Sequence, residues 1–333
     1  MKKILIIRLS AIGDVIHSTI IPKAIKEKHP DWEIHYMTQN NIDEILKNQK
    51  YIDKVIAWDY EKRSSFKYTL ETIKKLRKEK YDIIFNLTFA LRNYFLAFGA
   101  RPKKIAFKKI NTGLWVDDYY NSAKAIIKDL EKPESLELFV PDNIKEKVQN
   151  DIKQYPKPYI LISPGKFNNI RQGRIWDMEK WKKLCSLLKE KYHGTIFVNG
   201  SKCEKNYHKQ LANENVIVLS GKYNLEESCA LTSLMNLVIS GDSGPCHMAS
   251  ALDVNVLALL GSTSPDKIKP YGKKGYYIEP SFKCRYCWKK KCKYLKEGEA
   301  YAPCIESINP DDVMKKIQDN NLIKLKEIQH DTK

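Results

Sequence analysis

Short apolar runs alternate with helix-like segments along almost all of this 333-residue chain. The first run ends at Ile7, and an apolar pattern with helical spacing begins at Val15. A second series of the same kind starts at Tyr159. Strands that alternate with helices form parallel sheets covered by helices. The sequence therefore predicts an α/β protein with two Rossmann-like halves that face a central cleft.

The predicted strands are short and rich in Ile, Val, Leu and Phe. After the first, they cover residues 33–37, 54–58 and 81–86 in the first half, and 159–163, 195–199, 216–219, 237–240 and 254–260 in the second. An amphipathic helix is expected over residues 68–80, and Pro22 should interrupt the first helix because proline lacks an amide hydrogen. The two halves should join near residue 155, in a polar stretch punctuated by prolines.

Composition excludes several classes of protein. A hydrophobic fraction of 43%, with 14 Gly and 14 Pro, excludes disordered and collagen-like chains. No apolar run approaches the roughly 18 residues needed to cross a bilayer. The net charge of +18 suits nucleic acid, an anionic membrane surface or an acidic substrate, but it is spread over both halves. A lysine-rich background explains it equally well.

Residues 10–14 form the loop between the first strand and its helix. Such loops meet helix N-termini at the carboxyl edge of a parallel sheet, where anionic ligands bind. The loop lacks both the G-x-G-x-x-G dinucleotide pattern and the P-loop pattern. Asp14 has two interpretations at this stage: an N-cap of the helix, or a group that contacts a ligand.

The second half contains a similar loop after the strand 237–240. Its glycines, Gly241 and Gly244, allow a tight turn, and Pro245 suits the first turn of a helix. The amides of Ser243 and Gly244 can bind an anion. Asp242 is either the helix N-cap or a partner for sugar hydroxyls.

With these loops in view, the chain resembles glycosyltransferase family 9, the bacterial ADP-heptose:lipopolysaccharide heptosyltransferases. The resemblance rests on five motifs spread in order along the chain: Arg8-x-Ser10-x-x-Gly13-Asp14-Val15-x-His17, Ser163-Pro164-Gly165, the block from Asp242 to Ala249, Gly261-x-Thr263-x-Pro265, and Ile308-Asn309-Pro310-x-x-Val313. It implies a GT-B fold, inversion at the anomeric carbon, and transfer that requires no cofactor or divalent metal.

The resemblance also implies roles for single residues. Asp14 falls on the catalytic general base, and Asp242 on the residue that binds donor-sugar hydroxyls. Arg174 replaces the family's lysine that neutralises the departing diphosphate, and His247 is expected to pack or hydrogen-bond rather than to catalyse. The full predicted donor site is Ser163, Gly165, Lys166, Arg174, Glu204, Asp242, Ser243 and Gly244, with Arg171 in the same basic loop as Lys166.

The family's acceptor is an anionic lipid-linked glycan, the Kdo–lipid A core at the inner leaflet of the cytoplasmic membrane. The resemblance thus implies a cytoplasmic protein peripheral to that membrane, with no nucleic-acid partner. Candidate acceptor-binding residues are Ser10, Lys62, Arg63, Arg92, Arg101 and Lys103, with Lys67 nearby. The implied domains are an acceptor-binding domain (1–155), a nucleotide-sugar-binding domain (156–310) and a C-terminal helix (311–333) that packs back toward the first domain.

Four of the eight cysteines are clustered: Cys284, Cys287, Cys292 and Cys304. Their spacing allows a tetrahedral zinc or iron site, although it matches no common zinc ribbon, and free thiols are the alternative. Disulfides are disfavoured in a reduced cytosolic enzyme. Among lipopolysaccharide heptosyltransferases, the cluster favours the type that adds the second heptose.

Two other functions remain open. One is a protein O-heptosyltransferase, against which the lack of an extra N-terminal domain counts. The other is a non-catalytic protein that binds nucleotides or nucleic acid through the same fold and charge. A pure binder has no need of a carboxylate at Asp14 beside anions.

Overall fold

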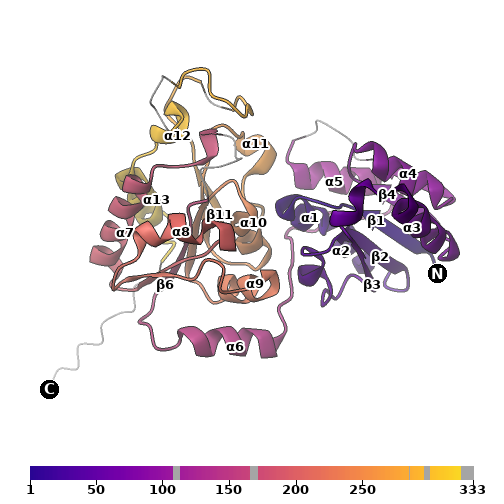
Figure 1. Ribbon diagram of the computed structural model, residues 1–333, viewed down its shortest axis with the longest axis horizontal. Helices are drawn as coiled ribbons and strands as arrows, with labels where there is room; N and C mark the ends of the chain where they lie inside the picture. Colours follow the sequence, from indigo (N-terminus) through magenta and orange to yellow (C-terminus); the bar gives the residue numbers. More distant parts are fainter. Residues whose placement is uncertain (108–112, 166–171, 285, 296–300, 324–333) are drawn as a thin grey trace.

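The computed structural model describes residues 1–107, 113–165, 172–284, 286–295 and 301–323. It contains two parallel sheets, each flanked by helices, as the sequence predicts (Figure 1). The predicted Lys166 and Arg171 lie outside the described residues.

The first sheet has the strand order β3-β2-β1-β4-β5. Its strands are β1 (Lys3–Ile7), β2 (Glu33–Gln39), β3 (Lys54–Trp58), β4 (Ile83–Asn86) and β5 (Lys104–Phe107). One face packs against α1 (Ile12–Ser18), α2 (Ile20–Lys28) and α5 (Trp115–Lys124), and the other against α3 (Phe66–Lys78) and α4 (Leu91–Gly99). The four residues of β1 after Lys3, Ile4 to Ile7, are all apolar and buried, as expected for a strand that is covered on both faces.

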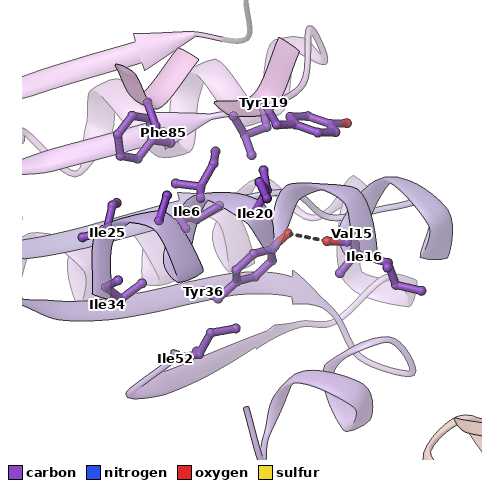
Figure 2. Packing of buried hydrophobic residues seen from close by; sticks show 14 of the residues in the cluster. Ile6, Val15, Ile16, Ile20, Ile25, Ile34, Tyr36, Ile52, Phe85 and Tyr119 are labelled. Atoms are coloured by element: carbon purple, nitrogen blue, oxygen red, sulfur yellow. Dashed lines mark hydrogen bonds between the residues drawn. The ribbon is translucent and has the colours of Figure 1, made fainter. Parts of the chain in front are cut away.

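Packing around β2 fixes the position of α1, the helix that carries Asp14. Figure 2 shows Ile6, Ile20 and Phe85 filling the space between the sheet and the helices. The hydroxyl of the fully buried Tyr36 lies 2.5 Å from Ser18 Oγ and 3.5 Å from the Val15 carbonyl. These bonds tie β2 to the helix just beyond Asp14.

The predicted break at Pro22 is confirmed. The chain forms two helices, α1 and α2, that meet at Thr19, with Pro22 in the first turn of α2. Proline cannot donate to the Ser18 carbonyl four residues earlier, and its ring would clash there. The helical path is therefore interrupted between Ser18 and Ile20, and both helices pack into the same core.

The second sheet has the order β11-β10-β9-β6-β7-β8. Its strands are β6 (Tyr159–Ser163), β7 (Thr195–Val198), β8 (Val216–Val218), β9 (Leu237–Gly241), β10 (Val256–Leu259) and β11 (Gly275–Ile278). The main helices are α6 (Asp142–Ile152), α7 (Met178–Tyr192), α9 (Leu225–Ser233), α10 (Gly244–Ala251) and α13 (Pro310–Asp319). Shorter helices are α8 (Lys205–His208), α11 (Pro265–Ile268) and α12 (Pro303–Glu306).

In both sheets the strand order reverses beside the first strand of the half, at β1–β4 and at β6–β9. Ligands of open parallel sheets bind at the carboxyl ends of the strands at such switch points. The loops after β1 and β9, which contain Asp14 and Asp242, both follow these positions.

The C-terminal helix does not pack where the sequence analysis placed it. In the described part of the segment, α13 lies against α7 of the second domain, on the side away from the first (Figure 1). Val313 and Ile317 are buried in the core of the second domain, and Trp176 Nε1 donates to the Ile308 carbonyl at 3.0 Å. The apolar stripe of α13 is thus satisfied within its own domain, so for α13 itself the predicted return toward the first domain is wrong.

Among the helices of the described residues, none combines the length and the apolar character needed to span a membrane.

Candidate active site

The loops after β1 and β9 face each other across a cavity of about 260 Å³ between the two domains. Residues from both domains line it: Ala11, Gly13, Asp14, His17 and Trp115 from the first, and Arg174, Asp242, Ser243, Gly244, His247, Ile268 and Trp288 from the second. A larger hollow along β11 and α13 is lined by the second domain alone. Because it brings Asp14 of the first domain together with Arg174 and Asp242 of the second, the cavity between the two loops best fits a reaction between two substrates.

Asp14 lies in the first turn of α1, and its side chain is about 12% exposed. The N-cap is Ala11, so the capping interpretation of Asp14 is wrong. One carboxylate oxygen pairs with the Arg8 guanidinium, and Oδ1 accepts a 3.0 Å hydrogen bond from the Tyr119 hydroxyl. Arg8 also donates to the Leu87 carbonyl at 2.8 Å. The carboxylate is thus held by β1, α5 and the loop after β4.

The Tyr119 hydroxyl donates a hydrogen bond to this carboxylate at any physiological pH. Burial raises the pKa of its hydroxyl well above the usual value, and the charge of Asp14 raises that pKa further. The hydroxyl therefore stays protonated at physiological pH and occupies one acceptor position on Oδ1. An ionised carboxylate has about four such positions, so room remains for a substrate hydroxyl.

Asp242 occupies the equivalent place in the second domain. Ser243, not Asp242, is the N-cap of α10, so the capping interpretation is wrong here as well. The Asp242 carboxylate pairs with Arg174 at 2.5 Å, and its other oxygen lies 3.5 Å from His247 Nε2. The Arg174 guanidinium also stacks over the Trp288 ring, 5.2 Å from the centroid. The predicted donor residues Arg174, Asp242, Ser243 and Gly244 are therefore brought together.

The two domains touch through α1 and α10. His17 Nε2 and His247 Nδ1 are 2.9 Å apart, and both rings are buried. A Cβ on Gly13 would lie 2.5 Å from His247 Cδ2, closer than carbon atoms can approach. Gly13 thus allows the α1 backbone to rest directly on the His247 ring. The prediction that His247 packs and hydrogen-bonds is confirmed.

The other predicted donor residues that the structure describes, Ser163, Gly165 and Glu204, lie at or after the ends of β6 and β7, along the same sheet edge. Ser163 ends β6 and is buried, and Gly165 has a φ of +76°, which favours glycine. The Gly165 carbonyl accepts a 3.0 Å bond from His208 Nε2, while Nδ1 lies 2.7 Å from the Ser220 hydroxyl. Burial lowers the pKa of His208, which favours the neutral ring. Its two hydrogen bonds stabilise the turn at Gly165.

Glu204 has a clear structural role. Its carboxylate accepts from the Ser201 amide and hydroxyl, each at 2.6 Å, in a capping box that follows β7. β7 is the strand next to β6. The role of Glu204 toward a ribose stays a prediction.

The predicted acceptor residues divide into two groups. Ser10, Lys62, Arg63 and Arg92 follow β1, β3 and β4, at the same sheet edge as Asp14. Arg101 and Lys103 precede β5 and so lie at the opposite edge, where Lys103 pairs with Asp82 at 2.7 Å. The prediction is therefore wrong for Arg101 and Lys103, because β5 was not recognised in the sequence.

The four clustered cysteines all lie within the described residues. No group of three or more His, Cys, Asp or Glu side chains in this part of the chain is arranged to hold a metal ion. Cys304 is buried, which raises the pKa of its thiol to about 11, whereas Cys284, Cys287 and Cys292 are half-buried. The four thiols in this arrangement do not form the predicted zinc or iron site.

Two residues that line the cavity, Trp115 and Trp288, and one partner of Asp14, Tyr119, were not singled out in the sequence. All three residues come from segments without a recognisable motif. The ring centroids of Trp115 and Trp288 lie 5.3 Å apart, so the two rings contact each other across the domain boundary. Arg8 belonged to a motif, but only its contact with Asp14 shows its role.

Comparison with known proteins identifies the family. Residues 69–297 match the family model of glycosyltransferase family 9 (heptosyltransferase). The chain belongs to this family. It is therefore a glycosyltransferase, and the predicted resemblance is confirmed.

Relatives of this family 9 enzyme support the assignment over most of its length. The lipopolysaccharide core heptosyltransferase OpsX of Haemophilus influenzae is 26% identical over 295 residues, which cover 81% of this chain and 82% of OpsX. A family 9 glycosyltransferase from Veillonella parvula has a TM-score of 0.83 at 20% identity and 96% coverage of both chains. E. coli heptosyltransferase WaaC with ADP-2-deoxy-2-fluoro heptose has a TM-score of 0.68 at 16% identity, covering 96% and 99%. The GT-B fold is thus confirmed.

The α1–α10 contact of this family 9 enzyme predicts the effect of Gly13→Ala. The added methyl group would strike the buried His247 ring and push the domains apart at the cavity. We expect kcat for sugar transfer to fall by roughly 10- to 100-fold, because small misplacements of reacting groups are costly. Steady-state kinetics with a nucleotide-sugar donor measures this.

His247→Ala provides the matched background. Without the ring the methyl group has space, so Gly13→Ala/His247→Ala should be about as active as His247→Ala alone. An equal loss from Gly13→Ala in both backgrounds would contradict the contact as the cause.

Proposed function

We propose that this enzyme transfers heptose from ADP-heptose to the inner core of lipopolysaccharide, with inversion at the anomeric carbon and Asp14 as the general base. The observation that carries the proposal is the position of Asp14, which faces the Arg174–Asp242 pair across one cavity in a heptosyltransferase family. A base on one side and a cationic anchor on the other suit displacement of a nucleoside diphosphate.

The donor belongs on the side of the second domain. The free amides at the start of α10, from Ser243 and Gly244, would bind the diphosphate together with the Arg174 guanidinium. Asp242 would then turn from Arg174 to the hydroxyls of the sugar. ADP-heptose is the donor we assign because OpsX is named a heptosyltransferase and WaaC was solved with an ADP-heptose analogue.

The transfer step uses groups of both domains. The acceptor hydroxyl oxygen attacks the anomeric carbon from the face opposite the diphosphate, while its proton passes to the Asp14 carboxylate. The bond between that carbon and the phosphate oxygen breaks, and ADP leaves with its electron pair. Arg174 and the α10 amides stabilise the added negative charge. No metal enters this scheme.

The acceptor belongs on the side of the first domain, at the cytoplasmic face of the inner membrane. Arg63 stacks on the Tyr60 ring at 4.1 Å, and Arg92 lies over the Trp58 ring at 5.4 Å. Arg92 also donates to the Arg63 carbonyl at 3.4 Å. These contacts join the two cations at the sheet edge of Asp14, where they would meet the carboxylates and phosphates of Kdo–lipid A, with Ser10 and Lys62 beside them.

Asp14→Asn tests the chemical role directly. The amide has nearly the same shape but cannot accept the proton, so kcat should fall by at least about a hundredfold. Donor affinity, measured by calorimetric titration with ADP-heptose, should change less than about twofold, because the donor lies in the other domain.

Asp242→Asn is the matched control, since it should weaken donor binding instead. Near-normal turnover of Asp14→Asn would contradict the base assignment.

Arg63→Ala/Arg92→Ala tests the acceptor side. We expect KM for the lipid-linked acceptor to rise roughly tenfold with kcat nearly unchanged, since charged hydrogen bonds contribute about 1.5–3 kcal/mol. Lys103→Ala, a cation at the opposite sheet edge, should leave KM unaltered. An unchanged KM in the double variant would exclude these two residues from the acceptor site.

A further inference from the structure

The α4 helix is apolar on two opposite faces. Leu96 and Ala97 are buried against the sheet, while Leu91, Phe95 and Phe98 are between 58% and 71% exposed. The spacing of four and then three residues places the exposed three on one side of the helix. Such a stripe is unfavourable in water, and large exposed apolar patches usually mark surfaces that contact another molecule or a membrane.

Neighbouring elements extend this stripe. Phe66 and Leu70, one turn apart on α3, are also exposed, and so is Phe89 in the loop before α4. Helices α3 and α4 pack side by side on the face of the first sheet turned away from the second domain (Figure 1). We name these residues the α3–α4 surface: Phe66, Leu70, Phe89, Leu91, Phe95 and Phe98.

Basic side chains flank the α3–α4 surface. Residues 61–78 contain seven Lys or Arg and only two Glu. Lys74 and Arg77 are exposed and continue the helical stripe that begins with Phe66 and Leu70. An apolar face edged with cations is typical of helices that lie in the interface of an anionic membrane.

The surface is linked to the active site by the loop after β4. Arg8, the partner of Asp14, donates to the carbonyl of Leu87, and Phe89 follows two residues later. The exposed Phe89 thus lies in a loop at the same sheet edge as the proposed general base. If Phe89 and α4 were inserted into a membrane, a lipid-linked acceptor in that membrane would lie close to this edge of the domain.

We propose that the α3–α4 surface is where the enzyme rests on an anionic phospholipid leaflet, with Phe66, Phe95 and Phe98 as apolar anchors and the α3 cations on the headgroups. This inference rests on the proposed function, because a lipid-linked acceptor gives the docking its purpose. The occupant we assign is the membrane rather than a second copy, because an excess of cations would repel an identical surface.

Vesicle sedimentation of the full chain tests the proposal. The wild type should bind equimolar phosphatidylcholine–phosphatidylglycerol vesicles more tightly than phosphatidylcholine vesicles, and salt should weaken the binding. Phe95→Ser/Phe98→Ser and Phe66→Ser/Leu70→Ser should each lower the partition coefficient roughly tenfold or more. Phe139→Ser removes an exposed phenylalanine elsewhere and should have less than about a twofold effect.

Three outcomes would overturn the assignment. The double variants could both bind vesicles as tightly as the wild type, or no protein could bind vesicles at all. The wild type could also sediment as a dimer while the double variants sediment as monomers, which would make the surface an interface between copies. Circular dichroism of each variant verifies its fold.

Kinetics separate this inference from the proposed function. With a delipidated, soluble acceptor the double variants should keep wild-type kcat and KM, whereas with acceptor in vesicles their kcat/KM should fall about as much as binding does. If the wild type turns over neither acceptor, the proposed function fails, while the vesicle measurements still decide the surface.

Discussion

The approach of α1 to α10 is the constraint on which the site depends. Gly13 has no side chain, so the α1 backbone rests on the His247 ring, and the bond from His17 to His247 fixes the contact. Asp14 follows Gly13 directly, and Asp242 lies within 3.5 Å of the same His247 ring. The contact therefore sets the distance between the Asp14 and Asp242 carboxylates, although they belong to different domains.

Each of these carboxylates has an arginine partner. Arg8 pairs with Asp14 and Arg174 with Asp242, and all four side chains are largely shielded from solvent. Partners compensate the cost of burying charge, which an isolated carboxylate in the cavity would carry in full. In the proposed reaction the two pairs behave differently. Arg8 stays anchored to the Leu87 carbonyl, whereas Arg174 exchanges Asp242 for the diphosphate.

Much of the architecture follows from the sequence alone, because buried parallel strands are continuously apolar. The strands at 54–58 and 159–163 have the predicted limits. β5 was missed because its apolar run, Ile105 to Phe107, has only three residues and lies between pairs of lysines, and this error misplaced Arg101 and Lys103. The prediction that α13 packs toward the first domain was wrong because an apolar stripe on a helix does not show which domain will bury it. Only the packing of α13 on α7 identifies the second domain as its partner. Contacts between distant segments, such as Tyr119 with Asp14 and Trp115 with Trp288, leave no local pattern.

The central claim is that donor and base meet in the interdomain cavity, and a crystal structure with ADP-2-deoxy-2-fluoro-heptose tests it most directly. The account predicts the diphosphate on the amides of Ser243 and Gly244 and on Arg174, the sugar hydroxyls on Asp242, and the anomeric carbon open toward Asp14. A diphosphate bound outside this cavity, or a sugar whose anomeric carbon faces away from Asp14, would contradict it.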